Sequence, residues 1–312
     1  IPINEKLLIL SSIPNNYLPP NIEGLCFECR KSFGDIPEEN EIKATAELLG
    51  FIFGSQLIPI GLSIYNRNDI LKQISISPSV SNLSRRLKQN PSPPIDIHYY
   101  INIQTLISAV LELLPQYLEK RDILQLNNAL SYYWIAKDSP VGVNLPILSS
   151  ALEAVANASL RDSRNTEQQS TYMPAVKYRK LIKNEFDEIK SKLDKKGIKY
   201  KNKIANKIDG AYNMGGENEK IDLLFDRFKL SVGDLEKEAL KSRNMMAHGA
   251  MKTIDYKKYE DIVRKSYAYE TLFHRVILKI LSYTGQYIDY YTYGYPLRPI
   301  DEPIPKEANE TV

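Results

Sequence analysis

The fold of this chain is decided by one stretch, Asp234-Leu-Glu-Lys-Glu-Ala-Leu-Lys-Ser-Arg-Asn-Met-Met-Ala-His-Gly249. Its first eight residues are good helix formers, and Ser231 or Asp234 can serve as the N-cap. Gly249 stands where the C′ residue of a helix is expected. The stretch therefore predicts a helix whose last turns carry a cluster of polar side chains.

The polar cluster consists of Arg243, Asn244 and His248, and nowhere else do a guanidinium, a carboxamide and an imidazole fall within six consecutive residues. On a helix, Asn244 and His248 share a face, and Arg243 lies about 100° to one side of Asn244. Histidine moves protons near neutral pH, and arginine matches phosphate oxygens with a charged fork of donors. Two interpretations fit these residues. They are capping and solvated side chains at a helix end, or they cleave a phosphodiester without a metal.

The spacing of the cluster resembles a known family. Arg243-Asn244 followed by three residues and His248 matches the R-N-x-x-x-H signature of the HEPN superfamily, and the flanking Ala247 and Gly249 are similar too. Two earlier segments, Leu126-Asn-Asn-Ala-Leu-Ser-Tyr-Tyr-Trp-Ile-Ala136 and Leu148-Ser-Ser-Ala-Leu-Glu-Ala154, resemble the paired core helices of Apea-like HEPN proteins. The resemblance covers about residues 100–285.

This resemblance implies a metal-independent endoribonuclease with no cofactor. In the reaction of such an enzyme, the ribose 2′-hydroxyl attacks the adjacent phosphate, and the product is a 2′,3′-cyclic phosphate. His248 is then the general acid or base, Arg243 holds the phosphate, and Asn244 orients one or both. The resemblance also implies a homodimer through the motif helix, an anti-phage, abortive-infection or toxin role, and a phage-derived or antitoxin regulator. The alternatives are a non-catalytic module that binds RNA, a nucleotide or a protein partner, and a purely structural helical domain.

Composition sets broad bounds on these alternatives. The 312 residues allow about two domains, and a net charge of +3 means that any contact with RNA must come from local patches. Two cysteines, Cys26 and Cys29, argue against a disulfide-built secreted fold. These two cysteines form a single CxxC. Zinc needs about four ligands, so we expect no metal here. No apolar run approaches the roughly 20 residues that span a bilayer, so no membrane contact and a cytoplasmic location are expected.

The chain divides into two parts near residue 95. Residues 1–95 are rich in proline and contain β-favouring runs at 24–30, 57–65 and 73–77, with a helix predicted over 38–53. Residues 84–94 have the composition of a linker. We therefore expect a small α+β N-terminal domain, the end of a larger one or complete in itself, followed by a helical domain over 96–312.

Helical periodicity runs through almost all of the second part. It predicts helices over 101–118, with Pro115 bending or ending the first, and over 121–137, 144–160, 174–193, 218–229 and 255–283, beside the motif helix. The predicted fold class is mainly α, an HEPN-like bundle of five to seven helices.

Several residues outside the motif are candidates for supporting roles. Glu153 is the one acid in an apolar helix, and it either pairs with Arg243 or lies on the exposed face. The stretch 172–207 is the most basic part of the chain; it is a solvated face or a phosphate contact. Its candidate RNA-binding residues are Lys177, Arg179, Lys180 and Lys183. His98 and His274 are interpreted as structural. The tyrosine-rich tail, 283–295, is expected to pack on the bundle or mediate association, with base stacking as the other interpretation.

Overall fold

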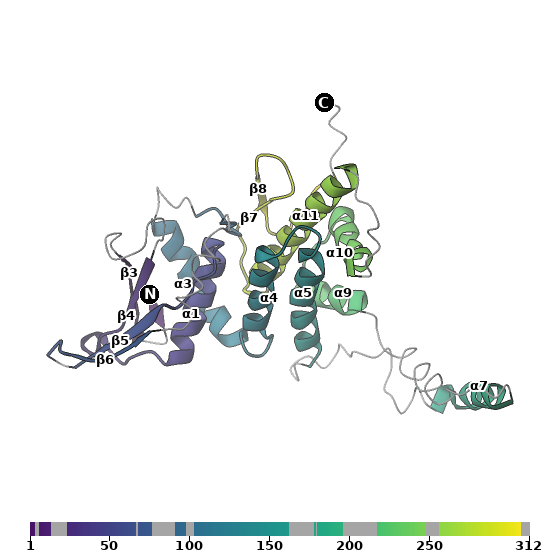
Figure 1. Ribbon diagram of the computed structural model, residues 1–312, viewed down its shortest axis with the longest axis horizontal. Coiled ribbons are helices and arrows are strands. Elements are labelled where there is room, and N and C mark those ends of the chain that lie inside the picture. The colour runs from purple at the N-terminus through teal and green to yellow at the C-terminus, as the bar shows by residue number, and fades with distance from the viewer. Residues whose placement is uncertain are drawn as a thin grey trace.

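The computed structural model describes residues 1–3, 6–13, 24–66, 68–76, 91–97, 103–161, 178, 180–195, 217–247 and 256–306. These parts of the chain are mostly helical, with four small antiparallel strand pairs. Figure 1 shows the N-terminal strands at one end, the helices α4, α5, α9, α10 and α11 in the middle, and α7 apart from them. The mainly α character predicted from the periodicity is confirmed at this level.

The N-terminal region consists of strand pairs around one helix, α1 (Glu39–Phe53). The strand pairs are β1 (Pro2–Ile3) with β2 (Lys6–Leu7), β3 (Ile9–Ile13) with β4 (Gly24–Glu28), and β5 (Gly61–Tyr65) with β6 (Leu71–Ile76). The expected strands at 24–30 and 73–77 are close to β4 and β6, but β5 begins only at Gly61, after Pro59. Strands β1 to β3 were not predicted.

Helix α1 begins as its sequence predicts and attaches the N-terminal region to the helices. The Glu41 side chain accepts a hydrogen bond from the Glu38 amide (2.7 Å), which satisfies one free N–H of the first turn. On α1, Glu47 accepts both Arg121 Nε (2.7 Å) and Arg121 Nη2 (2.8 Å), and Tyr117 Oη donates to it at 2.9 Å. This paired arrangement fixes α1 against the following helix more firmly than a single ion pair would.

The chain is closely packed where the linker was expected to end. Ser92, Ile95 and Ile97 are buried, and the Ser92 amide donates to the carbonyl of Gly54 at 3.1 Å. Gly54 has φ 65°, and a Cβ there would lie 2.1 Å from the Ser92 carbonyl carbon, so the position requires glycine. Residues 91–94 therefore pack between α1 and the helices, whereas 84–90 lie outside the described residues. The division into two domains stays a prediction.

The helical part contains seven described helices. These are α3 (Ile103–Lys120), α4 (Leu126–Asp138), α5 (Asn144–Arg161), α7 (Lys183–Lys195), α9 (Glu217–Arg227), α10 (Asp234–Ala247) and α11 (Tyr256–Ile280). Pro115 lies inside α3 and does not end it. The helix predicted over 121–137 begins five residues late because Arg121 to Gln125 form turns that end in a left-handed residue at Gln125 (φ 52°).

The core lies where α5 meets its neighbours. Helix α5 packs against α4, α9, α10 and α11, and α10 packs against α11 (Figure 1). The tail returns over α11 as a strand pair, β7 (Gln286–Ile288) with β8 (Leu297–Pro299), and Tyr287, Ile300 and Ile304 are buried. Within the predicted tail, 283–295, the expected packing on the bundle holds for Tyr287, while Tyr293 and Tyr295 are exposed. Within the described parts of the chain, every helix is too short or too polar to cross a bilayer.

Candidate functional site

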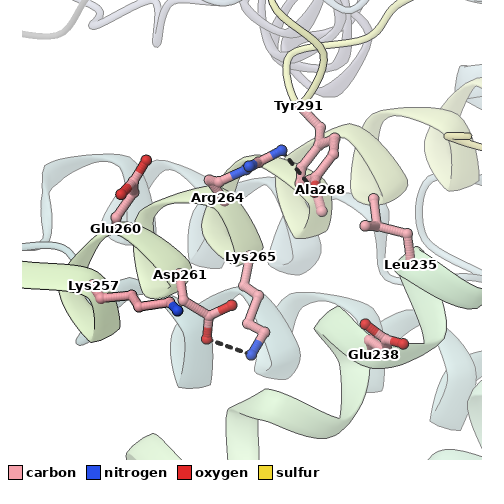
Figure 2. Close-up of a pocket in the computed structure, with 9 residues that line it drawn as sticks. All are labelled: Leu235, Glu238, Lys257, Glu260, Asp261, Arg264, Lys265, Ala268 and Tyr291. Carbon is pink, nitrogen blue, oxygen red and sulfur yellow. Dashed lines mark hydrogen bonds and ion pairs between the residues drawn. The ribbon is translucent and has the colours of Figure 1, made fainter. Parts of the chain in front are cut away.

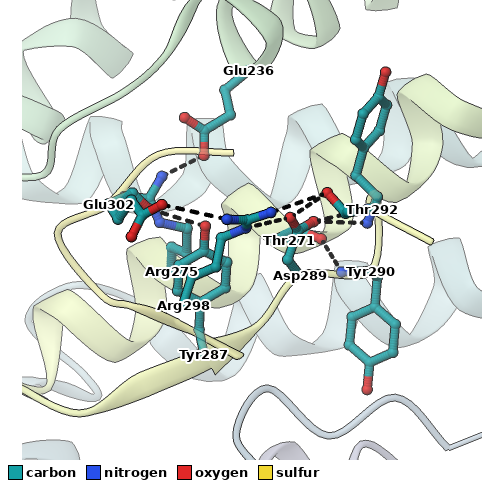
Figure 3. Close-up of polar contacts among 10 residues, drawn as sticks. Glu236, Thr271, Arg275, Tyr287, Asp289, Tyr290, Thr292, Arg298 and Glu302 are labelled. Atoms are coloured by element: carbon teal, nitrogen blue, oxygen red, sulfur yellow. Dashed lines mark hydrogen bonds and ion pairs between the residues drawn. The ribbon is translucent and has the colours of Figure 1, made fainter. Parts of the chain in front are cut away.

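The start of the motif helix α10 is fixed by a buried ion pair. Glu236, in the first turn of α10, is fully buried and pairs with the guanidinium of Arg275 on α11 (Figure 3). Its other carboxylate oxygen accepts the Gly233 amide at 2.7 Å. The Lys237 amide donates to the Gly233 carbonyl (3.1 Å), so Gly233 holds the N-cap position. The prediction of Ser231 or Asp234 as the N-cap is therefore wrong. Gly233 holds that position, and the Glu236 carboxylate accepts the hydrogen bond of its amide.

Arg275 uses its remaining donors to hold two other segments. Its Nη2 donates to the carbonyls of Ser231 and Ile300, both at 2.9 Å, and its guanidinium lies 5.0 Å from the centre of the Tyr287 ring. Every direction of the guanidinium is thus taken up by protein groups, as a fully buried charge requires. One residue of α11 therefore joins the motif helix, the loop before it and the tail.

A second polar cluster shapes the tail itself. Asp289 is fully buried and accepts Arg298 Nε (2.7 Å), Thr292 Oγ1 (2.6 Å) and the Tyr291 amide (3.0 Å) (Figure 3). The Tyr287 hydroxyl donates to the Glu302 carbonyl at 3.0 Å. These bonds close the tyrosine-rich segment into a turn against α11, which explains why a segment with so many polar residues is ordered.

The motif residues occupy the end of α10. The backbone is helical through Arg243 and Asn244 to Ala247, so the helix predicted there is present, and His248 lies outside the described residues. Positions seven apart return to nearly the same face of a helix. Position 243 is therefore on the face of the buried Glu236, and position 244 is on the neighbouring flank.

The supporting candidate Glu153 lies on helix α5. This helix packs against both α10 and α11. Glu153 is half-buried and accepts the Ser149 hydroxyl at 2.7 Å. The pairing of Glu153 with Arg243 stays a prediction.

A groove runs between α10 and α11. A hollow of about 270 Å³ is lined by Leu235, Glu238, Lys257, Glu260, Asp261, Arg264, Lys265, Ala268 and Tyr291 (Figure 2). Arg264 lies over the Tyr291 ring, 4.9 Å from its centre, and Lys265 pairs with Asp261 at 2.5 Å. The lining mixes both signs of charge.

The groove continues toward the motif. An adjoining hollow is lined by Glu238, Lys241, Ser242 and Lys265. Residues three apart are neighbours on a helix surface, so position 241 borders position 244. An extended ligand in the groove would therefore pass Lys241 and Lys265 on its way to the end of α10.

The candidate RNA-binding residues are only partly described. Lys183, the first residue of α7, and Lys180, three positions before it, are exposed, and Lys177 and Arg179 lie outside the described residues. Helix α7 itself carries four lysines and four acids. Helix α7 is thus charge-balanced, which weakens its expected attraction for phosphates.

A buried polar cluster that the sequence analysis did not group joins the N-terminal region to the bundle. Glu270 on α11 accepts Ser92 Oγ (2.7 Å), Tyr133 Oη (2.9 Å) and Lys137 Nζ (2.8 Å). His274 Nε2 lies 2.8 Å from the Tyr133 oxygen. The spacing of Glu270 and His274, four apart on one apolar face, was the available signal. Ser92 is 178 positions away, and sequence spacing could not have identified it.

This cluster is structural. Burial lowers the pKa of His274 to about 4, so the imidazole is neutral at pH 7. Burial alone would raise the pKa of Glu270. The Lys137 ammonium and the Ser92 hydroxyl outweigh the effect of burial, so the pKa of Glu270 is below its usual value. Because Tyr133 donates to Glu270, we assign the proton of His274 to Nε2, which donates to Tyr133. The interpretation of His274 as structural agrees with this environment; His98 lies outside the described residues.

No metal centre is formed within the described residues, where no three His, Cys, Asp or Glu side chains gather. Cys26 is exposed in β4, and Cys29 is half-buried just beyond it. Burial raises the pKa of the Cys29 thiol, which makes it a weaker nucleophile at neutral pH.

Comparisons with known proteins give no match. No family model, no curated protein and no solved structure matches this chain.

Proposed function

We propose that this chain is a metal-independent endoribonuclease of the HEPN type, folded as an HEPN-like bundle. The observation that carries the proposal is that α10 runs as a helix through Arg243 and Asn244, with its start held by a buried ion pair and its end bordered by the cationic side chains of Lys241 and Lys265. A helix that is fixed at its start gives the cluster in its last turns a defined direction, and phosphoryl chemistry needs fixed geometry.

The reaction needs only a proton shuttle and a charge clamp. The 2′-oxygen of the ribose forms a bond to phosphorus, the bond from phosphorus to the 5′-oxygen breaks, and the products are a 2′,3′-cyclic phosphate and a 5′-hydroxyl. His248 takes the 2′-proton or supplies the 5′-proton. Arg243 binds the phosphate oxygens, and Asn244 orients its neighbours. The chain acts as a cytoplasmic homodimer with its motif helices facing each other, in an anti-phage, abortive-infection or toxin role.

The first test is cleavage in EDTA. Total RNA and tRNA are incubated with the purified protein and with Arg243→Ala, His248→Ala and Lys237→Ala, the last removing an exposed cation from the same helix. We expect cyclic-phosphate ends with the parent and with Lys237→Ala, and a loss of roughly 10²–10⁴-fold in the two motif variants. Cleavage that is equal in all four proteins would come from a contaminant and would contradict the proposal. A monomer at micromolar concentration would contradict the dimer.

Glu153 provides a second test. Position 243 lies on the α10 face that carries buried Glu236, and α5 packs against that helix, so we assign Glu153 as the ion-pair partner that positions Arg243. Glu153→Gln is expected to lower the cleavage rate by about tenfold or more, as loss of a positioning charge does. Glu153→Asp is expected to recover part of the rate. Unchanged cleavage by Glu153→Gln, with an unchanged melting temperature, would place Glu153 outside the site.

A non-catalytic role is the second candidate, and the mixed charge of the groove favours it. Glu238, Glu260 and Asp261 lie among the cations there, an arrangement that suits a protein partner of mixed charge better than RNA alone. RNA binding by the parent protein and by His248→Ala, without cleavage by either, would favour this role.

A further inference from the structure

Helix α7 has an apolar stripe that no other described element covers. Ile182, Phe186, Ile189 and Leu193 follow one another at spacings of four, three and four residues, which keeps them within about 60° on one face. All four are half-buried, α7 contains no buried residue, and none of the described helices and strands packs closely against it. Figure 1 shows α7 standing away from the helices around α5.

A helix of this length needs a partner. Helix α7 has 13 residues, and isolated helices of about 12–15 residues are marginal in water. The Phe186 amide donates to the Ile182 carbonyl (2.9 Å), so Ile182, the residue just before α7, is joined to the first turn of the helix. The spacing of the stripe is that of the seam of a coiled coil.

The charges of α7 indicate which partner fits. Residues 183–188 hold three acids and one lysine, and residues 190–195 hold three lysines and one acid. The whole helix is neutral, so it offers no net attraction for nucleic acid or for an anionic membrane surface. The first half of α7 has a net negative charge and the second half a net positive charge, which suits the helix dipole. The same division makes α7 complementary in charge to an antiparallel copy of itself.

We propose that α7 pairs with α7 of a second copy of this chain as a short antiparallel coiled coil. In that pairing Ile182 meets Leu193 of the second copy and Phe186 meets its Ile189, so each layer joins two apolar side chains. Glu185 and Lys192, which flank the stripe on one side, meet with opposite charge across the seam. The contact does not involve the motif helix and does not depend on the proposed nuclease activity.

On one side of the stripe, like charges repel each other across the pair, but this repulsion is weak. Lys183 and Lys190 lie on the other side of the stripe, where an antiparallel pair brings them together. Lys190 Nζ lies over the Phe186 ring of its own helix, 4.6 Å from the centre, and both lysines are exposed to water. Charges in water repel weakly, by about 1 kcal/mol at 4 Å, and salt reduces this further.

The test is a disulfide that only the antiparallel pair can form. In a background with Cys26→Ser and Cys29→Ser, the changes Glu185→Cys and Lys192→Cys place two thiols seven residues apart, about 10 Å along one helix. That separation exceeds the roughly 7 Å limit for a bridge within the helix. Mild oxidation is expected to convert most of the full-length protein to a covalent dimer on a non-reducing gel. Glu185→Cys alone is expected to give little dimer.

Matched variants separate the stripe from the rest of the helix. Phe186→Glu, added to the protein that carries Glu185→Cys and Lys192→Cys, is expected to reduce the yield of covalent dimer at least tenfold. Asn184→Glu, on the opposite face, is expected to leave the yield unchanged. Ile189→Ala with Leu193→Ala removes the stripe while keeping good helix formers, and is expected to act like Phe186→Glu. Dimer yields that do not respond to the stripe, or equal yields from Glu185→Cys alone, would overturn the proposal.

Discussion

Replacing Arg275 with methionine is expected to lower the free energy of unfolding by about 3–5 kcal/mol, the usual effect of removing one partner from a buried ion pair. The change leaves Glu236 fully buried without its cation and deprives the carbonyls of Ser231 and Ile300 of their donor. Burial already raises the pKa of Glu236, and without Arg275 the carboxyl is expected to take up a proton.

Urea unfolding of the parent and of two α11 variants measures this effect. Lys279→Met is the matched control, because Lys279 lies one turn further along the helix and pairs with the exposed Asp301. Surface pairs contribute about 0–1 kcal/mol. Adding Glu236→Gln to Arg275→Met is expected to recover part of the loss, since a neutral amide needs neither a cation nor a bound proton when it is buried. Equal losses for Arg275→Met and Lys279→Met would show that the buried pair does not hold α10.

Acidification is expected to weaken the fold between about pH 6.5 and pH 4. An unfolded histidine has a pKa near 6.5, whereas burial lowers the pKa of His274 to about 4. In this window the unfolded chain binds a proton that the folded chain does not, so stability is complete above pH 6.5 and falls as the pH is lowered. The difference corresponds to about 3 kcal/mol. The lowered pKa of Glu270 adds a loss of the same sign at still lower pH.

Urea midpoints at pH 7.5 and pH 4.5 test this expectation. His274→Gln keeps a donor toward Tyr133 but cannot titrate, so it is expected to be less stable at pH 7.5 and to lose most of the pH dependence. His98→Gln is the control and is expected to keep the slope. A slope that persists in His274→Gln would assign the acid sensitivity to other groups.

Local sequence signals predicted the helices well and the early strands poorly. The apolar spacing in α5 and α11 and the Glu41 cap of α1 were strong signals within a single element. Strands β1 and β2 have only two residues each and depend on pairing with each other, so no periodicity reveals them. Pro115 does not end α3, which leaves the predicted bend as the other alternative.

The candidate site was predictable only where it lies within one helix. The order Arg243, Asn244, His248 is visible in the sequence, and the helix that carries the first two is present. The residues that hold this helix were not visible, because Glu236 and Arg275 are 39 positions apart and each looks like an ordinary charged residue of an amphipathic helix. Long-range pairing of buried charges leaves no local pattern.

Two consecutive residues of α11 face different halves of the chain. His274 contacts Tyr133 and the ring of Phe51 on α1, and Arg275 holds the start of α10. A rotation or slide of this one turn would break both sets of contacts together. The N-terminal region and the start of the motif helix are thus held by adjacent residues of one helical turn.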